Sequence, residues 1–290
     1  MYAFLRLGCL LAALLFSCSV FSQNLLITYQ KNDALFVCGT DTFFVQVKNT
    51  GNVPVSDATL AVTLPTGMIY QLGSVTGITE QNVTNPASPV FTVPLLPVGV
   101  TVSAVLLLSA DCAAATALDA GQLFVANLEV YSSQGGAQVT TLPFSIETGL
   151  LLIDSVDQVL LNGERCDTLF RKIWVRNTRL GKIGGLHFED EHQPGFDAAV
   201  PGANSQTSTA TLLKGDFGGS WFTGFGDGDT WLELGETAFF TERIIITDCG
   251  IPSFTNSSVL RVGWGCGDQI CRYDSLIVGT VIHPSTKVPD

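Results

Sequence analysis

The sequence predicts an all-β protein made of two β-sandwich domains in tandem. Three observations support this fold class. Apolar residues make up 46% of the chain and charged residues only 14%, and 29 Gly and 12 Pro divide it into short runs. No stretch shows the i, i+3, i+4 apolar spacing of a long amphipathic helix. The third observation is an internal repeat, in which an early segment and a late segment each occur twice.

The first 22 residues are predicted to be a signal peptide. Arg6 is their only charge, and the apolar run after it ends in small residues suited to cleavage before Gln23. The run is too short for a membrane span, which needs about 20 residues. Lipid anchoring at Cys18 is the less favoured alternative, because Phe16 is bulky where a lipoprotein motif usually has a small residue. We expect a secreted or cell-surface protein with no transmembrane segment in the mature chain.

The repeat aligns residues 38–50 with residues 166–178 without gaps. Both segments begin with Cys and end with Asn-Thr. In both, apolar side chains recur at every second residue, as in a strand with one face in a core. Later, an apolar triplet, a hydroxyl residue and Asp-Cys recur, and each copy ends in a predicted hairpin. We expect domains at 23–148 and 149–290, each with enough short strands for an immunoglobulin-like sandwich. The alternative, one jelly roll over the whole chain, does not explain the duplication.

Six cysteines follow the signal peptide, an even number that suits disulfides in an oxidising compartment. Equivalent cysteines in two copies should pair alike, because each copy is expected to fold around its own core. A bridge that closes so long a loop contributes roughly 4 kcal/mol in the chain-entropy treatment. The predicted pairs are Cys38–Cys112, Cys166–Cys249 and, by subtraction, Cys266–Cys271 across the neck of the last hairpin.

Residues 49–67 contain an Asn turn, an alternating strand and then Leu64-Pro-Thr-Gly67, and the second copy contains a Gly-Asp-Gly…Gly-Glu run at 226–236. These motifs resemble a bacterial surface-repeat family of unassigned function, although the second copy lacks Leu-Pro-x-Gly. Members of that family are immunoglobulin-like repeats that occur in tandem in large exported surface proteins. The resemblance implies surface display, adhesion or spacing, and it names no ligand.

The candidate sites for chemistry are few. The chain has three His, no Gly-x-Ser-x-Gly and no cysteine expected to stay a free thiol, so the sequence predicts no catalytic residues and no enzyme. The run from His187 to His192 carries several metal-ligand types and is interpreted as a solvated polar loop. Asp227, Asp229 and Glu236 lie in a Gly-rich loop that suits calcium; the alternative is a tight turn capped by these carboxylates. No other cofactor is expected.

Trp221 and Trp231 accompany this acidic loop. Exposed aromatic rings can stack on sugars, and the alternative is that both rings fill the core beneath the loop. The predicted function is structural or adhesive, with an unknown protein or glycan as the surface ligand. The alternative function is a carbohydrate-binding module that uses the loop at 216–236. The formal charge of −12 argues against a nucleic-acid partner.

Overall fold

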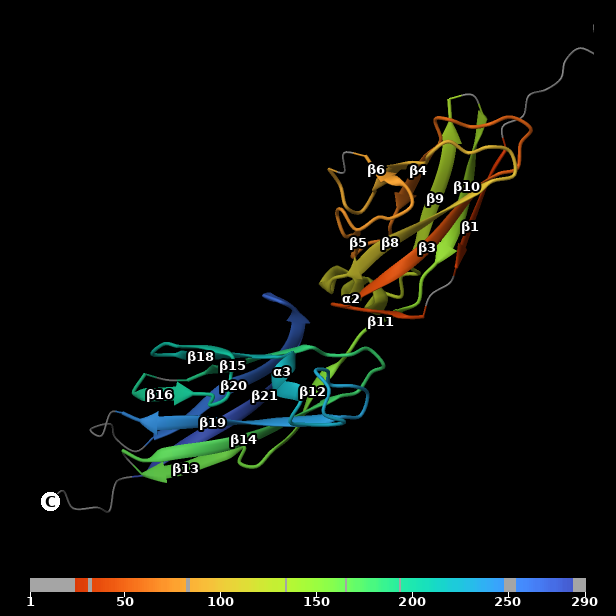
Figure 1. The fold of residues 1–290 in the computed structure, drawn as a ribbon. Helices are drawn as coiled ribbons and strands as arrows, with labels where there is room; N and C mark the ends of the chain where they lie inside the picture. The colour runs from red at the N-terminus through yellow and green to blue at the C-terminus, as the bar shows by residue number, and fades with distance from the viewer. Residues whose placement is uncertain are drawn as a thin grey trace, which may run out of the picture.

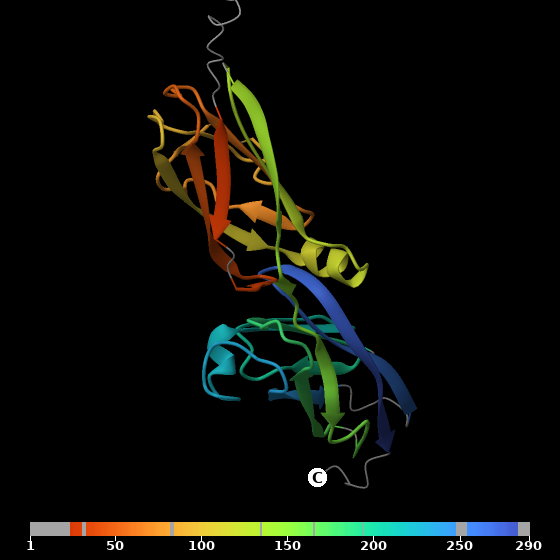
Figure 2. The ribbon, with the colours of Figure 1, turned by 90° about the vertical axis from the view of Figure 1, so that its right-hand side faces the viewer.

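The computed structural model describes residues 24–30, 33–81, 84–133, 135–164, 166–192, 194–247 and 254–283. The expected signal peptide and Cys249 lie outside these residues. The described chain is almost entirely β, and its sheets pack as two sandwiches that lie end to end (Figures 1 and 2). The predicted all-β class and tandem sandwich architecture are confirmed. The boundaries at 23–148 and 149–290 stay predictions.

The N-terminal sandwich consists of a four-stranded sheet, a five-stranded sheet and one short parallel pair. The first sheet has the order β1 (Leu25–Gln30), β3 (Thr40–Asn49), β8 (Thr101–Ala110) and β5 (Met68–Tyr70). The second has the order β10 (Gly135–Pro143), β9 (Val125–Ser132), β4 (Thr59–Thr63), β7 (Val90–Thr92) and β6 (Thr79–Glu80). The short pair is β11 (Ile146–Glu147) with β2 (Leu35–Phe36).

The C-terminal sandwich has a four-stranded and a six-stranded sheet. The first has the order β12 (Leu151–Val156), β14 (Thr168–Asn177), β19 (Thr237–Ile246) and β16 (Phe196–Ala199). The second has the order β13 (Leu160–Glu164), β21 (Gln269–His283), β20 (Phe254–Cys266), β15 (Gly185–Glu191), β18 (Leu212–Gly218) and β17 (Ser205–Ser208). Helices are limited to α2 (Cys112–Asp119) and α3 (Gly219–Phe222) within the described ranges.

The two sandwiches have the same topology. The order β1-β3-β8-β5 corresponds strand for strand to β12-β14-β19-β16, and β10-β9-β4-β7-β6 corresponds to β21-β20-β15-β18-β17. Cys38 and Cys166 occupy equivalent positions just before β3 and β14, and both have positive φ, at 67° and 63°. Apart from these two cysteines, positive φ in the described residues occurs at glycine. The repeat in the sequence is therefore a repeat of backbone structure as well.

The repeated asparagine has the same role in both copies. Asn49 is fully buried, and its Nδ2 donates to the carbonyl four residues later and to that of Leu96 (2.8 and 2.9 Å). Asn177 is equally buried, and its Nδ2 donates to the carbonyl four residues later and to that of Leu232 (2.7 and 2.9 Å). Each Oδ1 accepts the backbone N–H two residues on. These amides pair backbone groups that would otherwise be buried without partners.

Helix α2 begins where the repeated Asp-Cys motif ends β8. Asp111 is its N-cap, with a side-chain oxygen that accepts from the N–H of Ala113 at 2.8 Å. Gly67, the glycine of Leu-Pro-x-Gly, packs so closely on this helix that a Cβ there would come within 2.0 Å of the Ala114 nitrogen. This close approach holds the start of α2, and with it Cys112, at the end of the sandwich.

A buried charged cluster joins the two sheets of the C-terminal sandwich. Arg171 on β14 lies 3.1 Å from Glu242 on β19 and 3.9 Å from Asp190 on β15, and all three side chains are at most 1% exposed. The remaining guanidinium groups donate to the carbonyls of Gln158 and Gly279. Burial raises the pKa of Glu242 well above its ordinary value of 4.5, and the negative charge of Asp190 adds to this effect.

We predict that Glu242 makes the protein less stable as the pH rises. The folded protein binds the Glu242 proton more tightly than the unfolded chain does. The stability that this tighter proton binding contributes is therefore complete below about pH 4.5. As the pH rises from there towards the pKa of Glu242 in the folded protein, the free energy of unfolding falls by about 1.4 kcal/mol per pH unit. Glu242→Gln cannot ionise, so the fall in unfolding free energy between pH 5 and pH 8, measured in urea, should be smaller in this variant.

The matched control is Asp197→Asn, which changes an exposed carboxylate on the neighbouring strand β16. It should retain the pH dependence of the wild type. An equal fall with pH in wild type and Glu242→Gln would contradict the prediction.

Candidate functional site

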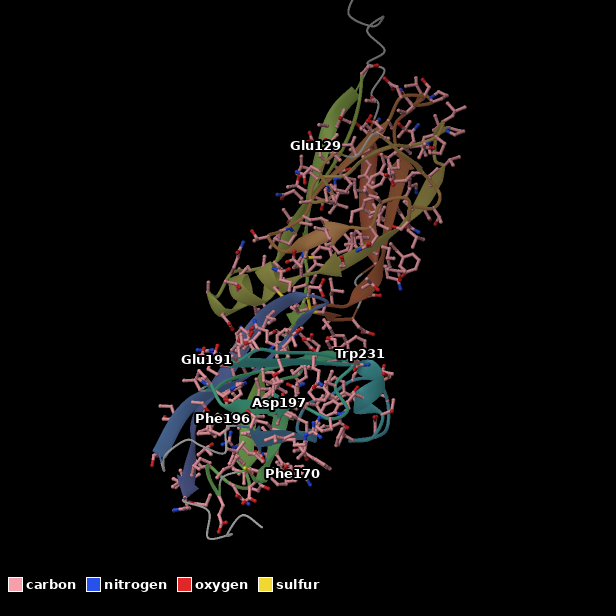
Figure 3. All side chains as sticks on the ribbon, turned by 90° about the vertical axis from the view of Figure 1, so that its left-hand side faces the viewer. Glu129, Phe170, Glu191, Phe196, Asp197 and Trp231 are labelled. Carbon is pink, nitrogen blue, oxygen red and sulfur yellow. A yellow bond between two sulfur atoms is a disulfide. The ribbon has the colours of Figure 1, made fainter. Side chains whose placement is uncertain are left out.

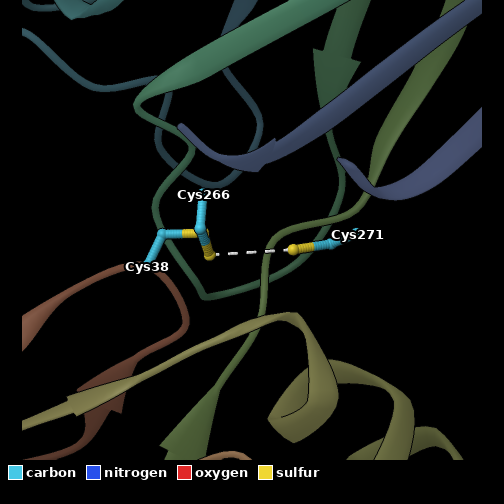
Figure 4. Close-up of side chains that lie close together, drawn as sticks. All are labelled: Cys38, Cys266 and Cys271. Atoms are coloured by element: carbon cyan, nitrogen blue, oxygen red, sulfur yellow. Dashed lines mark hydrogen bonds between the residues drawn. A yellow bond between two sulfur atoms is a disulfide. The ribbon is translucent and has the colours of Figure 1, made fainter. Parts of the chain in front are cut away.

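Two disulfides connect the sandwiches to each other. Cys38 is bonded to Cys266 (Figure 4). Cys112 is bonded to Cys271. The predicted pairs Cys38–Cys112 and Cys266–Cys271 are therefore wrong. Cys166 is also a disulfide cysteine, but its expected partner lies outside the described residues, so that pair stays a prediction.

The error has a geometric cause. The tip of the β20–β21 hairpin reaches the end of the N-terminal sandwich at which α2 lies (Figure 2). Cys112 is the first residue of α2, and the disulfides bring Cys38 and Cys112 to this hairpin. The Sγ of Cys266 lies 3.8 Å from the Sγ of Cys112 and 3.8 Å from the Sγ of Cys271. All four sulfurs form one cluster, so membership of the cluster does not by itself identify the pairs.

Polar contacts around the disulfides add to this junction. Asp119, at the end of α2, accepts from Arg179 at 3.0 Å and pairs with Arg272, both from the C-terminal sandwich. The Nζ of Lys182 lies 5.8 Å from the ring centre of Phe36 on β2. Ion pairs as exposed as Asp119–Arg179 contribute about 0–1 kcal/mol. The two covalent bonds therefore dominate the orientation of the sandwiches.

A cavity of about 530 Å³ opens beside these disulfides. The N-terminal sandwich contributes Cys38 to its wall, and the C-terminal sandwich contributes His187 on β15, Asp216 on β18, Trp231 and the hairpin-turn residue Asp268. Figure 3 shows Trp231 on the side of the C-terminal sandwich that faces the N-terminal one. The junction and the cavity are thus one structural feature.

Asp216 is the centre of a short hydrogen-bonded chain in this wall. One carboxylate oxygen lies 2.5 Å from His187 Nδ1, and the other accepts from Ser205 Oγ at 2.8 Å. Nucleophilic catalysis needs the hydroxyl to be bonded to the base. Here the serine donates to the carboxylate and not to the imidazole, so the three groups do not have the order of a Ser-His-Asp triad.

The two predicted sugar-stacking residues occupy different environments. Trp221 on α3 is half-buried and packs on the edge of the core against Phe217 and Phe225, with ring centres 4.4 and 4.7 Å away. Trp231 lines the cavity, where its ring packs on Gly184. The structure therefore does not bring the two tryptophans together as one platform beside the acidic loop.

The carboxylates of that loop cap its turns. The two oxygens of Glu236 accept the N–H groups of Asp227 (3.0 Å) and Glu233 (2.7 Å). Asp227 and Asp229 each accept the N–H two residues later, at 3.1 and 2.6 Å. Lys182 forms an ion pair with Glu233, and this hydrogen bond raises the pKa of Lys182. The structure brings Asp227, Asp229 and Glu236 into one loop, as hydrogen-bond acceptors for its backbone.

Metal-ligand side chains converge elsewhere. Within the described part of the chain, the group of three or more close enough to share an ion is Cys38, Cys266 and Cys271, which are disulfide cysteines. Calcium binding by the acidic loop stays a prediction.

Residues 187–191 of the run from His187 to His192 belong to strand β15, and His192 follows the strand and is buried, so the run is not the solvated loop that the sequence suggested. Residues 187, 189 and 191 lie on its outer face, where Glu189 accepts from Lys214 at 2.6 Å and raises the pKa of Lys214. Asp190 points into the core. Two members of this run thus have roles that sequence reasoning missed: His187 in the cavity wall and Asp190 beside Arg171.

Comparison with protein-family models and with curated proteins gives no match. Among solved structures, the chain is similar to the C-terminal domain of the AgI/II polypeptide BspA of Streptococcus agalactiae. The identity is 8% and the TM-score 0.38, over 89% of this chain and 100% of that one. It is also similar to the C-terminal domain of AspA, an antigen I/II-family protein of Streptococcus pyogenes. The identity there is 8% and the TM-score 0.31, over 89% of this chain and 99% of that one.

Domains 4 and 5 of the S-layer protein SbsC are a third similar structure, at 9% identity and a TM-score of 0.26 over 89% of this chain and 97% of that one. These three structures are thus domains of two streptococcal antigen I/II polypeptides and of an S-layer protein. All three TM-scores are below 0.5, so the function proposed below rests on the residues of this chain.

We predict that peptide mapping without reduction will find Cys38 joined to Cys266 and Cys112 joined to Cys271. Digestion on the amino side of aspartate is required, because Asp268 is the cleavage point between the two hairpin cysteines. A reduced sample is the control and should release every linked peptide. Recovery of Cys38 linked to Cys112 would contradict the assigned pairs.

We also predict that Glu236→Ala lowers the free energy of unfolding by roughly 1 kcal/mol, since two backbone N–H groups, one exposed and one partly buried, lose their acceptor. Thermal melting with added calcium and with EDTA separates capping from metal binding. If the carboxylates only cap the turn, calcium leaves the melting temperature of wild type and variant unchanged. A calcium-dependent rise that is present in wild type and absent in Glu236→Ala would establish the loop as a calcium site.

Proposed function

We propose that this protein is an exported, cell-surface structural or adhesive unit without catalytic activity, in which two β-sandwiches act as one rigid body. The observation that carries the proposal is the pair of disulfides between the sandwiches. A single covalent link would permit rotation about it. Two links from one hairpin to two separate points of the other sandwich restrict that rotation.

The disulfides also support an extracellular location. Such bonds form and persist in oxidising compartments and are rare in the cytosol. The predicted signal peptide agrees with export. In the described residues, no helix has the length and apolar character needed to cross a bilayer.

The features of the surface fit spacing or adhesion better than catalysis. The hydroxyl nearest to an imidazole–carboxylate pair, Ser205, is not bonded to the imidazole. The acidic loop uses its carboxylates to hold its own backbone. An adhesive unit needs neither a reactive hydroxyl nor carboxylates free for catalysis. It requires a stable shape that presents its surface at a fixed angle.

Carbohydrate binding is a second candidate function. The position of Trp231 in the wall of the junction cavity favours it, whereas Trp221 is not part of that wall and packs instead on Phe217 and Phe225. The ligand surface supported by the structure is therefore the cavity and not the whole loop at 216–236.

Export can be tested directly with the complete chain. Expressed with its own first 22 residues in a Gram-negative host, the protein should reach the periplasm or medium, begin at Gln23, and show no thiol that reacts with an alkylating agent before reduction. The control is the chain without residues 1–22, which should stay in the cytosol with reactive thiols. A full-length chain that remains cytosolic with free thiols would overturn the proposal.

A further inference from the structure

We propose that the cavity at the junction binds a neutral saccharide unit, stacked on Trp231 and hydrogen-bonded through Asp216. This inference extends the proposed function, because it gives the surface unit a ligand class and a location for its site. Small-molecule sites are concave, with an aromatic or apolar wall and a few well-placed polar groups. The cavity of about 530 Å³ combines these features.

Trp231 gives the cavity a preformed aromatic wall. Its ring packs on Gly184, where a Cβ would come within 2.6 Å of the ring carbon Cζ3. Its backbone N–H donates to the Asp229 carboxylate at 2.6 Å. The indole is therefore held both through its backbone and along one part of its ring. A half-buried, rigid aromatic ring offers a sugar an apolar stacking surface at low cost in conformational entropy.

The polar groups in the wall are equally fixed. Asp216 is held by His187 and Ser205, and its side chain is still 52% exposed, so its oxygens can accept further hydrogen bonds. Asn204 accepts the N–H of Gly218 through Oδ1 at 2.6 Å, which leaves its amide N–H groups as donors. Sugar hydroxyls both donate and accept, so they match a wall that offers acceptors and donors together.

The charges in the wall select among saccharides. Asp216 and Asp268 both line the cavity, and no Lys or Arg belongs to the described lining. A sialic or uronic acid would bring its carboxylate towards these two, and like charges in a binding site oppose association. A neutral hexose or N-acetylhexosamine brings no such charge.

The site also depends on the junction. Cys38 and Cys266, which form one of the two disulfides, both belong to the cavity wall. Because the wall contains residues from both sandwiches, reduction of that bond would let one part of the wall move relative to the other. Binding should therefore weaken when Cys38 and Cys266 are both replaced by serine.

The first test is a glycan array probed with the purified, disulfide-bonded protein. The array carries neutral glucose, galactose, mannose and N-acetylhexosamine oligosaccharides beside sialylated, uronate-containing and amino-sugar counterparts. We expect neutral glycans to bind. Absence of binding to any neutral glycan, or binding restricted to the charged ones, would overturn the inference.

The second test is isothermal titration with the neutral oligosaccharide that binds on the array. Trp231→Ala and Asp216→Asn should each weaken binding about tenfold or more, as loss of a central contact does. The matched control is Trp174→Ala, a half-buried tryptophan on β14 outside the cavity, which should bind within twofold of wild type.

Folding is checked by the melting temperature and the disulfide map of each variant. Asp216→Asn preserves the shape of the side chain, so it decides the question if Trp231→Ala does not fold. Wild-type affinity in a folded Trp231→Ala or Asp216→Asn variant would refute the site. Because both tests use purified protein, their failure leaves the export experiment unaffected.

Discussion

One buried amide closes each sandwich. Asn49 and Asn177 each bond two carbonyls and a backbone N–H at the point where the chain leaves a central strand and turns into the opposite sheet. Backbone groups enclosed there cannot reach water, and a buried polar group without a partner costs about 1–3 kcal/mol. This need explains why Asn-Thr is retained in both copies although the segments that follow differ, and it sets the geometry on which both sandwiches are built.

The sequence contained enough information for the class of fold, the closing hairpins and the duplication, because each depends on local alternation and turn residues. The same alternation also indicates which charged residues are buried. Arg171 is in phase with Ile173 and Val175, and Asp190 is in phase with Leu186 and Phe188, all of them buried. Charged residues in phase with core residues indicate a buried ionic cluster. Interpreting residues 187–192 as a polar loop missed this phase.

The junction could not be predicted in the same way. A repeated sequence indicates how each copy folds by itself, whereas the pairing of these cysteines depends on how the two copies dock. Cys266 belongs to a hairpin with no cysteine counterpart in the first copy, and its partner Cys38 is 228 residues away in the other sandwich. The cavity has the same origin, since Cys38, His187 and Trp231 are distant in sequence and come together through docking and long-range strand pairing.

The bond between Cys38 and Cys266 has a mechanical consequence. These residues are 228 positions apart, and the sulfur bridge provides a direct path for tension between them. When a force pulls on the chain before Cys38 and after Cys266, the disulfide carries the tension from one cysteine to the other. The chain between these two cysteines then bears no load. That long segment, with most strands of both sandwiches, cannot be drawn out while the bond is intact. Among the described strands, β1, β2 and β21 lie on the loaded route, and the strands from β3 to β20 lie between the two bonded cysteines, so tension applied at the ends does not extend them.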